Sequence, residues 1–401
     1  MLSQINKLHQ LAHKPSRLIL GLMSGTSLDG LDIALCKVSG ADFDTQVELL
    51  AFTTAEYPTQ FKEQTREVFA KSHVKSTDLC LLNVTTASMH ASLINQTLAG
   101  WGRTSEEIDL IASHGQTIFH MPKRQHKIPN QPNATLQVGD GDHIAAKTGI
   151  ITVSDFRQKH IAHGGEGAPL ALYGDYLLTG RAAQARVLLN IGGIANFSYF
   201  PTDASINEVV CTDVGPGNTL MDAFVQQHFN KPYDKNGDIA ASGKVHDGLI
   251  SALMNDAFFE QSLPRTTGQD YFNLDWLTNI FSSNSLKKIS KFDILCTLNH
   301  FAARCIADAI RSVTNDLAHT QILLSGGGYL NKYLIRNIEQ YLKRPLDGTS
   351  EAIGLDPDAK EAMLFAILAN QLVASDVNEA QRQSSNSDYP WVSMGKVSFP
   401  L

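Results

Sequence analysis

The chain has 401 residues, of which 43% are hydrophobic and 18% charged, as is usual for a globular protein with ample core material. At roughly 150 residues per domain, this length predicts two or three domains, or one large one. Lys and Arg number 33 against 40 Asp and Glu, so the net charge is −7, which argues against general binding to nucleic-acid phosphates. No apolar stretch is long enough to span a membrane, and we expect a soluble, cytoplasmic protein.

Five scattered cysteines, none in a CxxC pair, predict neither a disulfide framework nor a zinc knuckle. His160, His163 and Glu166 suggest a metal site, but Gly164 and Gly165 would break any helix that placed them on one face. Several common signatures are also missing: no P-loop, no GxGxxG after a strand and no GxSxG elbow occur. The chemistry must therefore be sought elsewhere.

The first half of the chain begins with an extension, residues 1–16. Apolar runs at 18–23, 31–38 and 47–53 then predict three successive strands, of which the first two are joined by the Gly-rich turn SGTSLDG. A predicted helix at 79–101 and a short strand at 108–112 follow. This order of elements is typical of an RNase H-like half.

A second, similar set of elements follows. We expect strands at 187–190, 195–200, 208–212 and 321–324, and helices after DVGPGN, through 302–317 and at 330–342. Thr219 and Asp222 have the spacing of a capping box. The pattern predicts two α/β halves with a cleft between them. We place one domain at residues 1–150 plus about 375–401, and the other at 151–374.

The segment from Ser24 to Asp32, SGTSLDGLD, is the most informative. A tight turn of this composition points successive backbone N–H groups inward, which suits a polyphosphate, and Asp29 or Asp32 could hold a magnesium-bound water. The alternative is an ordinary β-hairpin with a polar turn.

Two further glycine-rich turns follow strands. Asp213, in CTDVGPGN, ends a predicted strand beside two glycines, where a carboxylate can act as a general base. Its alternative role is a helix N-terminal charge. SGGGYLN, from Ser325, offers a bare backbone surface for a nucleobase or ribose, or else a tight strand-to-helix connection. Three such turns in this order are better evidence together than separately.

These residues make the chain recognisable. It resembles the anhydro-N-acetylmuramic acid kinases, a family of the sugar-kinase, Hsp70 and actin superfamily, from about Arg17 nearly to the C-terminus. The blocks that carry the resemblance are GLMSGTSLDGLDIAL, SHGQTIFH, LQVGD, SDFR with GGEGAPL, LNIGGIANFS, DVGPGNTLMD, KPYDKNG, TGQDYFN and LSGGGYLN.

The resemblance implies two RNase H-like, actin-like ATPase domains that close over an active-site cleft. It also implies ATP with Mg²⁺, a homodimer, and a role in peptidoglycan recycling. In the implied reaction, water opens the 1,6-anhydro ring of anhydro-N-acetylmuramic acid while O6 takes the γ-phosphate, giving N-acetylmuramic acid 6-phosphate.

Roles carry over residue by residue onto matching positions. Asp213 matches the catalytic base. The ATP-phosphate turn matches Gly25, Thr26, Ser27, Leu28, Asp29, Gly30, Leu31 and Asp32, and the adenosine side matches Gly326, Gly327 and Gly328. The sugar pocket matches Gln116, Thr117, Asp155, Arg157, Gly165 and Gly167. Arg157 is expected to pair with the lactyl carboxylate. Glu361 is expected to order the magnesium shell, or else to be a solvated helix charge.

The chain departs from the family pattern at Gln158, His160 and Glu166, where DFRRRD and GGQG are expected. These changes lie beside the sugar-pocket residues, so they bear on sugar preference. Two alternatives therefore stay open: an actin-fold ATPase with a nucleotide-gated binding role, and a kinase for a different amino sugar.

Overall fold

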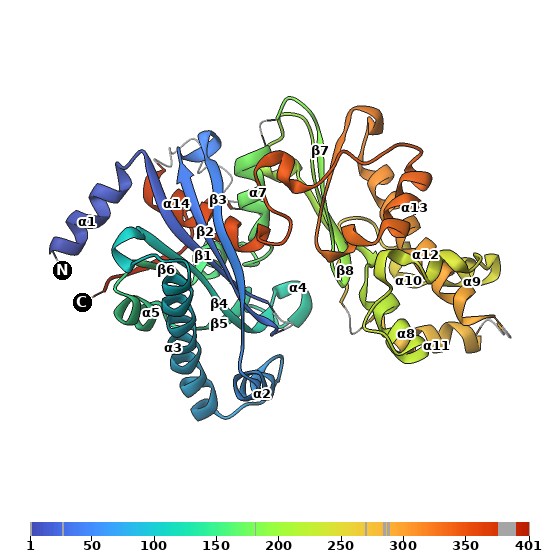
Figure 1. Ribbon diagram of the computed structural model, residues 1–401, viewed down its shortest axis with the longest axis horizontal. Coiled ribbons are helices and arrows are strands. Elements are labelled where there is room, and N and C mark those ends of the chain that lie inside the picture. The colour runs from blue at the N-terminus through green and yellow to red at the C-terminus, as the bar shows by residue number, and fades with distance from the viewer. Residues whose placement is uncertain are drawn as a thin grey trace. The chain divides into compact units, whose positions relative to one another are not determined.

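The computed structural model describes residues 2–25, 28–180, 182–268, 271–283, 286, 289–375 and 390–400. The chain divides into two compact units, one of residues 1–178 and 354–401 and the other of residues 179–353. Each unit is α/β and has its own sheet (Figure 1). The division differs from the predicted boundaries, because 151–178 and 354–374 group with the first unit.

The first unit is built on a seven-stranded sheet in the order β11-β6-β4-β1-β2-β3, with β5 paired to β4. Strands β1, β2 and β3 form an antiparallel meander, and β4 runs parallel to β1, with β6 parallel to β4. This is the predicted RNase H-like arrangement. The strands are β1 (Ser16–Ser24), β2 (Gly30–Ser39), β3 (Gln46–Glu56), β4 (Leu110–Met121), β5 (Ala134–Val138), β6 (Thr152–Ser154) and β11 (Lys396–Ser398).

Helices cover both faces of this sheet. Successive side chains of a strand point to opposite faces. Leu20 and Leu22 join the hydrophobic cluster of α3, whereas the intervening Gly21 lies against Ala362 of α14. The helices of this unit are α1 (Leu2–Ala12), α2 (Thr59–Val68), α3 (Ser76–Gly100), α4 (Lys123–His126), α5 (Gly141–Thr148), α6 (Phe156–Ala162), α7 (Ala171–Thr179) and α14 (Lys360–Ala374).

The second unit repeats the strand pattern of the first. Strands β7, β8 and β9 form an antiparallel meander, and β10 runs parallel to β7 in the order β10-β7-β8-β9. The repeat is one of topology, since no repeat is visible in the sequence. The strands are β7 (Arg186–Ile191), β8 (Ile194–Phe200), β9 (Val210–Pro216) and β10 (Gln321–Ser325).

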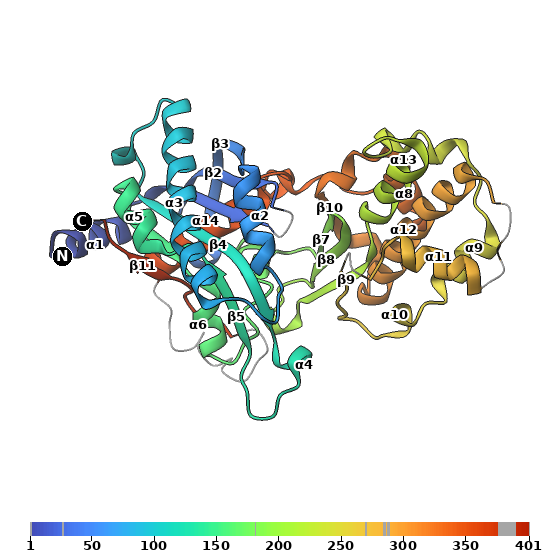
Figure 2. The ribbon, with the colours of Figure 1, turned by 90° about the horizontal axis from the view of Figure 1, so that it is seen from below.

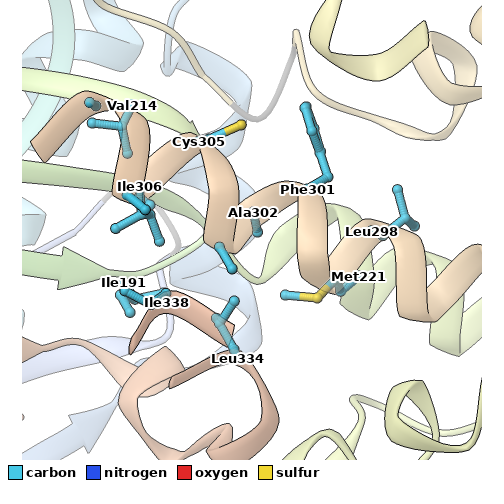
Figure 3. Close-up of a cluster of buried hydrophobic side chains, with 14 of the residues drawn as sticks. Ile191, Val214, Met221, Leu298, Phe301, Ala302, Cys305, Ile306, Leu334 and Ile338 are labelled. Atoms are coloured by element: carbon cyan, nitrogen blue, oxygen red, sulfur yellow. The ribbon is translucent and has the colours of Figure 1, made fainter. Parts of the chain in front are cut away.

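Helices of the second unit gather around α12 (Figure 2). The α12 side chains Phe301, Cys305 and Ile306 lie in one buried cluster with Ile191 of β7 and Val214 of β9 (Figure 3). The helices are α8 (Thr219–Phe229), α9 (Asp247–Met254), α10 (Ala257–Glu260), α11 (Leu274–Ser283), α12 (Lys291–Val313) and α13 (Lys332–Leu342). Among the described helices, none is both long and apolar enough to cross a membrane.

Several local expectations need correction. Strand β4 runs on through the SHGQ segment to Met121, and β9 continues past Asp213 to Pro216, because both are paired by neighbouring strands. The extension before the first strand contains the helix α1. Helix α8 begins at Thr219 as expected, but Asn218 is its N-cap and no side chain caps it, so the capping box is wrong.

Candidate active site

The turn that was predicted to bind ATP phosphate, residues 25–29 and the start of β2, connects β1 to β2 and is called the phosphate turn below. Ser24 ends β1, and the Leu28 N–H donates to the Gly25 carbonyl at 3.4 Å, which closes the turn. Leu28 is buried and has a φ of 60°, while Asp29 is exposed. Gly30 and Leu31 already belong to β2. Thr26 and Ser27, both expected to bind phosphate, lie outside the described residues.

Two carboxylates lie near one another beside this turn. Asp32 accepts a hydrogen bond from the Thr54 hydroxyl at 2.6 Å. Burial raises the pKa of Asp32, and the charge of Asp29 adds to the rise. Glu361 lies in the first turn of α14 and is exposed as a residue. The surrounding protein nevertheless desolvates its carboxyl group, which raises the pKa of Glu361, and the nearby negative charge of Asp32 raises it further. The carboxylates of Glu361 and Asp32 thus lie near the turn between β1 and β2.

The two β4 residues that were predicted to line the sugar pocket have different environments. Gln116 is fully buried, accepts from Ser24 Oγ at 2.5 Å and donates through Nε2 to the Gly25 carbonyl at 3.3 Å. It therefore lies behind the phosphate turn. Thr117 accepts from Gln137 Nε2 at 3.2 Å. Gln137 in turn lines a polar pocket.

This pocket of about 430 Å³ lies beside the middle of β4, at His114 and Gly115, and at the end of β6, at Ser154. Its wall includes the N-terminus of α5, at residues 140–142, together with Asp155 and Lys396. Asp155 has left-handed backbone geometry and accepts from Lys396 Nζ at 2.5 Å. Lys396 lies in β11. No local signal in the sequence indicated this strand, so Lys396 was not predicted as a site residue. The pocket combines one cation, Lys396, with the carboxylates of Asp140, Asp142 and Asp155 and with a helix N-terminus, a set that can hold a polar ligand.

Arg157 lies beside that pocket but is committed to internal partners. Its Nε and Nη2 face His114 Nε2 at 3.2 and 2.8 Å, and Nη1 donates to the Gly167 carbonyl at 2.6 Å. Burial lowers the pKa of Arg157 to about 10, with Glu361 acting in the opposite direction. Since His114 accepts from a cation, its ring must be neutral, and burial followed by the Arg157 charge lowers its pKa.

His160 and Arg157 together hold the glycine segment that was assigned to the sugar pocket. His160 Nδ1 accepts from the Gly167 N–H at 2.7 Å, and Nε2 faces the Tyr173 hydroxyl at 2.7 Å. The segment passes so close to the imidazole that a Cβ on Gly165 would lie 2.2 Å from Cε1 of His160. The departure at His160 therefore has a clear local role.

The other two departures make contacts nearby. Glu166 forms a salt bridge with Arg124 at 2.9 Å, and Gln158 donates to the Thr135 carbonyl at 2.9 Å. Among the described residues no group of three or more His, Cys, Asp or Glu side chains is arranged to hold a metal ion.

In the second unit, Asp213 lies inside β9 and is half-buried. Its carboxylate accepts from the Thr267 N–H at 2.9 Å, and its own N–H donates to the Arg265 carbonyl at 3.0 Å. Arg265 is anchored in turn, with its guanidinium carbon 4.3 Å from the centre of the Phe258 ring. The segment 265–267 thus orients Asp213, and sequence reasoning did not assign it that role.

The glycine turn of the second unit lies at the same edge of the sheet. Ser325 of β10 pairs in parallel with Asn190 of β7, so these strands end together. Gly326 has a φ of 76°, and a Cβ there would lie 2.4 Å from Asn190 Oδ1, so only glycine fits. Gly328 passes close to Ile191, while a Cβ on Gly327 would meet open space. Strand β9 runs in the same direction as β7, because both are antiparallel to β8.

The predicted residues therefore fall into two groups. The first unit holds the phosphate turn, Glu361 and all the residues that were predicted to line the sugar pocket. The second unit holds Asp213 and the turn at 326–328. The residues that were missed, His114, Thr267 and Lys396, all act through contacts with segments distant in the sequence.

Comparison with known proteins gives one consistent family. Residues 17–384 match the family model described as anhydro-N-acetylmuramic acid kinase. The proteins of that name from Pseudoalteromonas atlantica and Pseudoalteromonas translucida are 47% and 46% identical, with alignments covering 100% and 98% of both chains. The one from Caldanaerobacter subterraneus subsp. tengcongensis is 36% identical over 98% of this chain and 100% of its own. This chain belongs to the anhydro-N-acetylmuramic acid kinase family.

Proposed function

We propose that the chain is an ATP-dependent kinase that opens the 1,6-anhydro ring of anhydro-N-acetylmuramic acid and phosphorylates O6. The observation that carries this proposal is the family match over 17–384, at 47% identity to a relative of that name. The geometry agrees with it, because a glycine turn follows β1 in the first unit and β10 in the second, and each unit carries a carboxylate in a strand, Asp32 in β2 and Asp213 in β9. A kinase needs such positioning elements.

In the proposed reaction Asp213 takes a proton from the water that attacks the anomeric carbon C1. The bond between C1 and O6 breaks, and O6 attacks the γ-phosphorus as the bond to ADP breaks. The departing O6 needs no protonating acid, since phosphorus captures it. One carboxylate then suffices where an inverting glycosidase uses two. The Thr267 N–H supports this role by orienting the Asp213 carboxylate.

We assign ATP phosphate to the turn from Gly25 to Asp32 and adenosine to Gly326 and its neighbours. Magnesium would supply charge neutralisation at the phosphates. The residues fit an oxygen-ligated ion, because burial and neighbouring like charge raise the pKa values of Asp32 and Glu361. Since Mg²⁺ keeps several waters and substrate oxygens, these two carboxylates can order its shell without forming a complete site.

The sugar is proposed to occupy the polar pocket beside Asp155. We do not assign the lactyl carboxylate to Arg157, as the sequence suggested, because Arg157 already donates to His114 and Gly167. Lys396 is the exposed cation of the pocket and is assigned to that carboxylate. Arg157 instead shapes the pocket from behind, through its contact with the lining residue His114.

The resemblance also supports a cytoplasmic homodimer that serves peptidoglycan recycling. Light scattering on the purified chain tests the dimer: a monomer at assay concentration would refute it.

The product of the reaction tests the function. The protein is incubated with ATP, Mg²⁺ and anhydro-N-acetylmuramic acid in oxygen-18 water. We expect a product with one phosphate and one heavy oxygen at C1 by mass spectrometry. Unchanged sugar with ATP hydrolysed would favour the actin-fold ATPase alternative, and turnover of another amino sugar would favour a different substrate.

Asp213→Asn separates catalysis from nucleotide binding. The amide cannot accept the proton of the attacking water, so we expect turnover to fall at least ~10²-fold, as for loss of general base catalysis, with ATP binding retained. Full sugar-dependent activity in this variant would refute the assignment of Asp213.

A further inference from the structure

A chain of four buried polar side chains lies behind the phosphate turn of the first unit. It joins His90 of α3, Tyr57 after β3, Ser24 at the end of β1 and Gln116 of β4, and each of the four is at most 4% exposed. His90 Nε2 lies 2.8 Å from the Tyr57 hydroxyl, which donates to Ser24 Oγ at 2.8 Å. Ser24 then donates to Gln116 Oε1 at 2.5 Å.

The direction of every hydrogen bond follows from the Gln116 end. Gln116 Nε2 faces two carbonyls, those of Gly25 and Thr117, at 3.3 Å each. Carbonyls only accept, so Nε2 must donate and Oε1 must point at Ser24. The Ser24 hydroxyl therefore donates to Gln116 and accepts a hydrogen bond from the Tyr57 hydroxyl. The Tyr57 oxygen then accepts from His90 Nε2–H.

The His90 end has one protonation state that fits. His90 Nδ1 is buried and has no hydrogen-bond partner among the described residues. A proton on Nδ1 would have no acceptor there, so the neutral ring with its proton on Nε2 is favoured. Burial accordingly lowers the pKa of His90 to about 4. The chain therefore points one way, from α3 to the carbonyl of Gly25.

We propose that Tyr57 and His90 are positioning residues for nucleotide binding, holding Ser24 and Gln116 so that the Gly25 carbonyl, where the phosphate turn begins, keeps one position. A buried, fully directional network specifies one arrangement, since reversing any member leaves a polar group without a partner. The inference rests on the proposed binding of ATP phosphate by this turn. It assigns a function to two residues that the family motifs leave out.

Tyr57→Phe removes the hydroxyl and keeps the ring. We expect the dissociation constant of a non-hydrolysable ATP analogue and the KM for ATP to rise about five- to tenfold, the effect of one hydrogen bond. The KM for the anhydrosugar should stay within twofold. Phe61→Leu is the matched control, because its ring packs 4.7 Å from that of Tyr57 but bears no polar group. It should lower stability without changing the KM for ATP.

His90 variants test the direction of the chain. His90→Leu should weaken ATP binding as Tyr57→Phe does, and the double variant should be no weaker, because either change interrupts the same chain. His90→Gln, whose amide can donate to Tyr57, should restore most of the binding.

Two results would overturn the proposal: analogue binding by Tyr57→Phe within twofold of the parent, or equal losses in Tyr57→Phe and Phe61→Leu. Results on the parent protein distinguish a failure of the proposed function from these two outcomes. A parent that binds the analogue but leaves the anhydrosugar unchanged refutes only the reaction, whereas a parent that does not bind the analogue refutes the positioning role as well.

Discussion

Acidification should loosen the first unit through His160, whose ring is fully buried between Gly167 and Tyr173. Nδ1 accepts from the Gly167 N–H, so a proton on that nitrogen would break the contact. Burial first, then the charge of Arg157, lowers the pKa of His160 from 6.5 to about 4. The unfolded chain therefore binds a proton at pH values where the folded unit does not.

The sign and size of the effect follow from this difference. The free energy of unfolding is unaffected by His160 above pH 6.5 and falls as the pH drops from 6.5 towards 4. Each pH unit in this window costs about 1.4 kcal/mol. Between pH 7.5 and pH 5.0 the loss is therefore about 2 kcal/mol from His160. His90, whose pKa is also lowered to about 4, adds a similar loss.

The assay compares His160→Asn with the parent, because the Asn side chain keeps an acceptor for Gly167 and does not titrate. Trp101 and Trp391 lie in the first unit and Trp276 in the second, so a Trp276→Phe background makes tryptophan fluorescence report the first unit alone. Urea unfolding is followed at pH 7.5 and pH 5.0 in both proteins.

The change with pH decides the outcome, whatever the absolute stability of the variant. We expect His160→Asn to lose about 2 kcal/mol less than the parent on acidification. Equal losses in both proteins would show that His160 is not held neutral in the folded unit, and the hydrogen-bond assignment at Gly167 would be wrong.

Two further changes test packing and the pocket. Gly21→Ala would put a Cβ 1.9 Å from the backbone oxygen of Ala362, so we expect the free energy of unfolding in urea to fall by about 3 kcal/mol. Gly100→Ala is the control and should not destabilise the protein, because a Cβ there meets nothing within 4 Å. Similar effects at both sites would refute the close approach of α14 to β1. Lys396→Met should raise the KM for the anhydrosugar several-fold, because an exposed ion pair contributes up to about 1 kcal/mol. The KM for ATP should stay unchanged. An unchanged KM for the anhydrosugar in steady-state kinetics would refute the assignment of Lys396 to the sugar carboxylate.

The strands and the glycine turns were predictable from the sequence because both are local signals. Apolar runs of strand length marked β1, β2 and β7, and glycines followed the ends of β1 and β10. Each such signal depends on neighbours in the chain, so it can be read before any tertiary contact is known. The same signals placed Asp213 in a strand next to a glycine turn, although the strand runs further than expected.

Contacts between distant segments were decided only by the tertiary structure. Lys396 lies 241 residues from its partner Asp155, and β11, which carries it, is a three-residue strand with no periodicity to detect. No local pattern in the sequence distinguishes Tyr57 and His90 from ordinary core residues. They lie behind Ser24 only because the sheet packs against α3. Likewise β6 joins the first unit only because it pairs with β4. A sequence pattern records which face of an element is apolar, whereas the partner on that face depends on strand order and register.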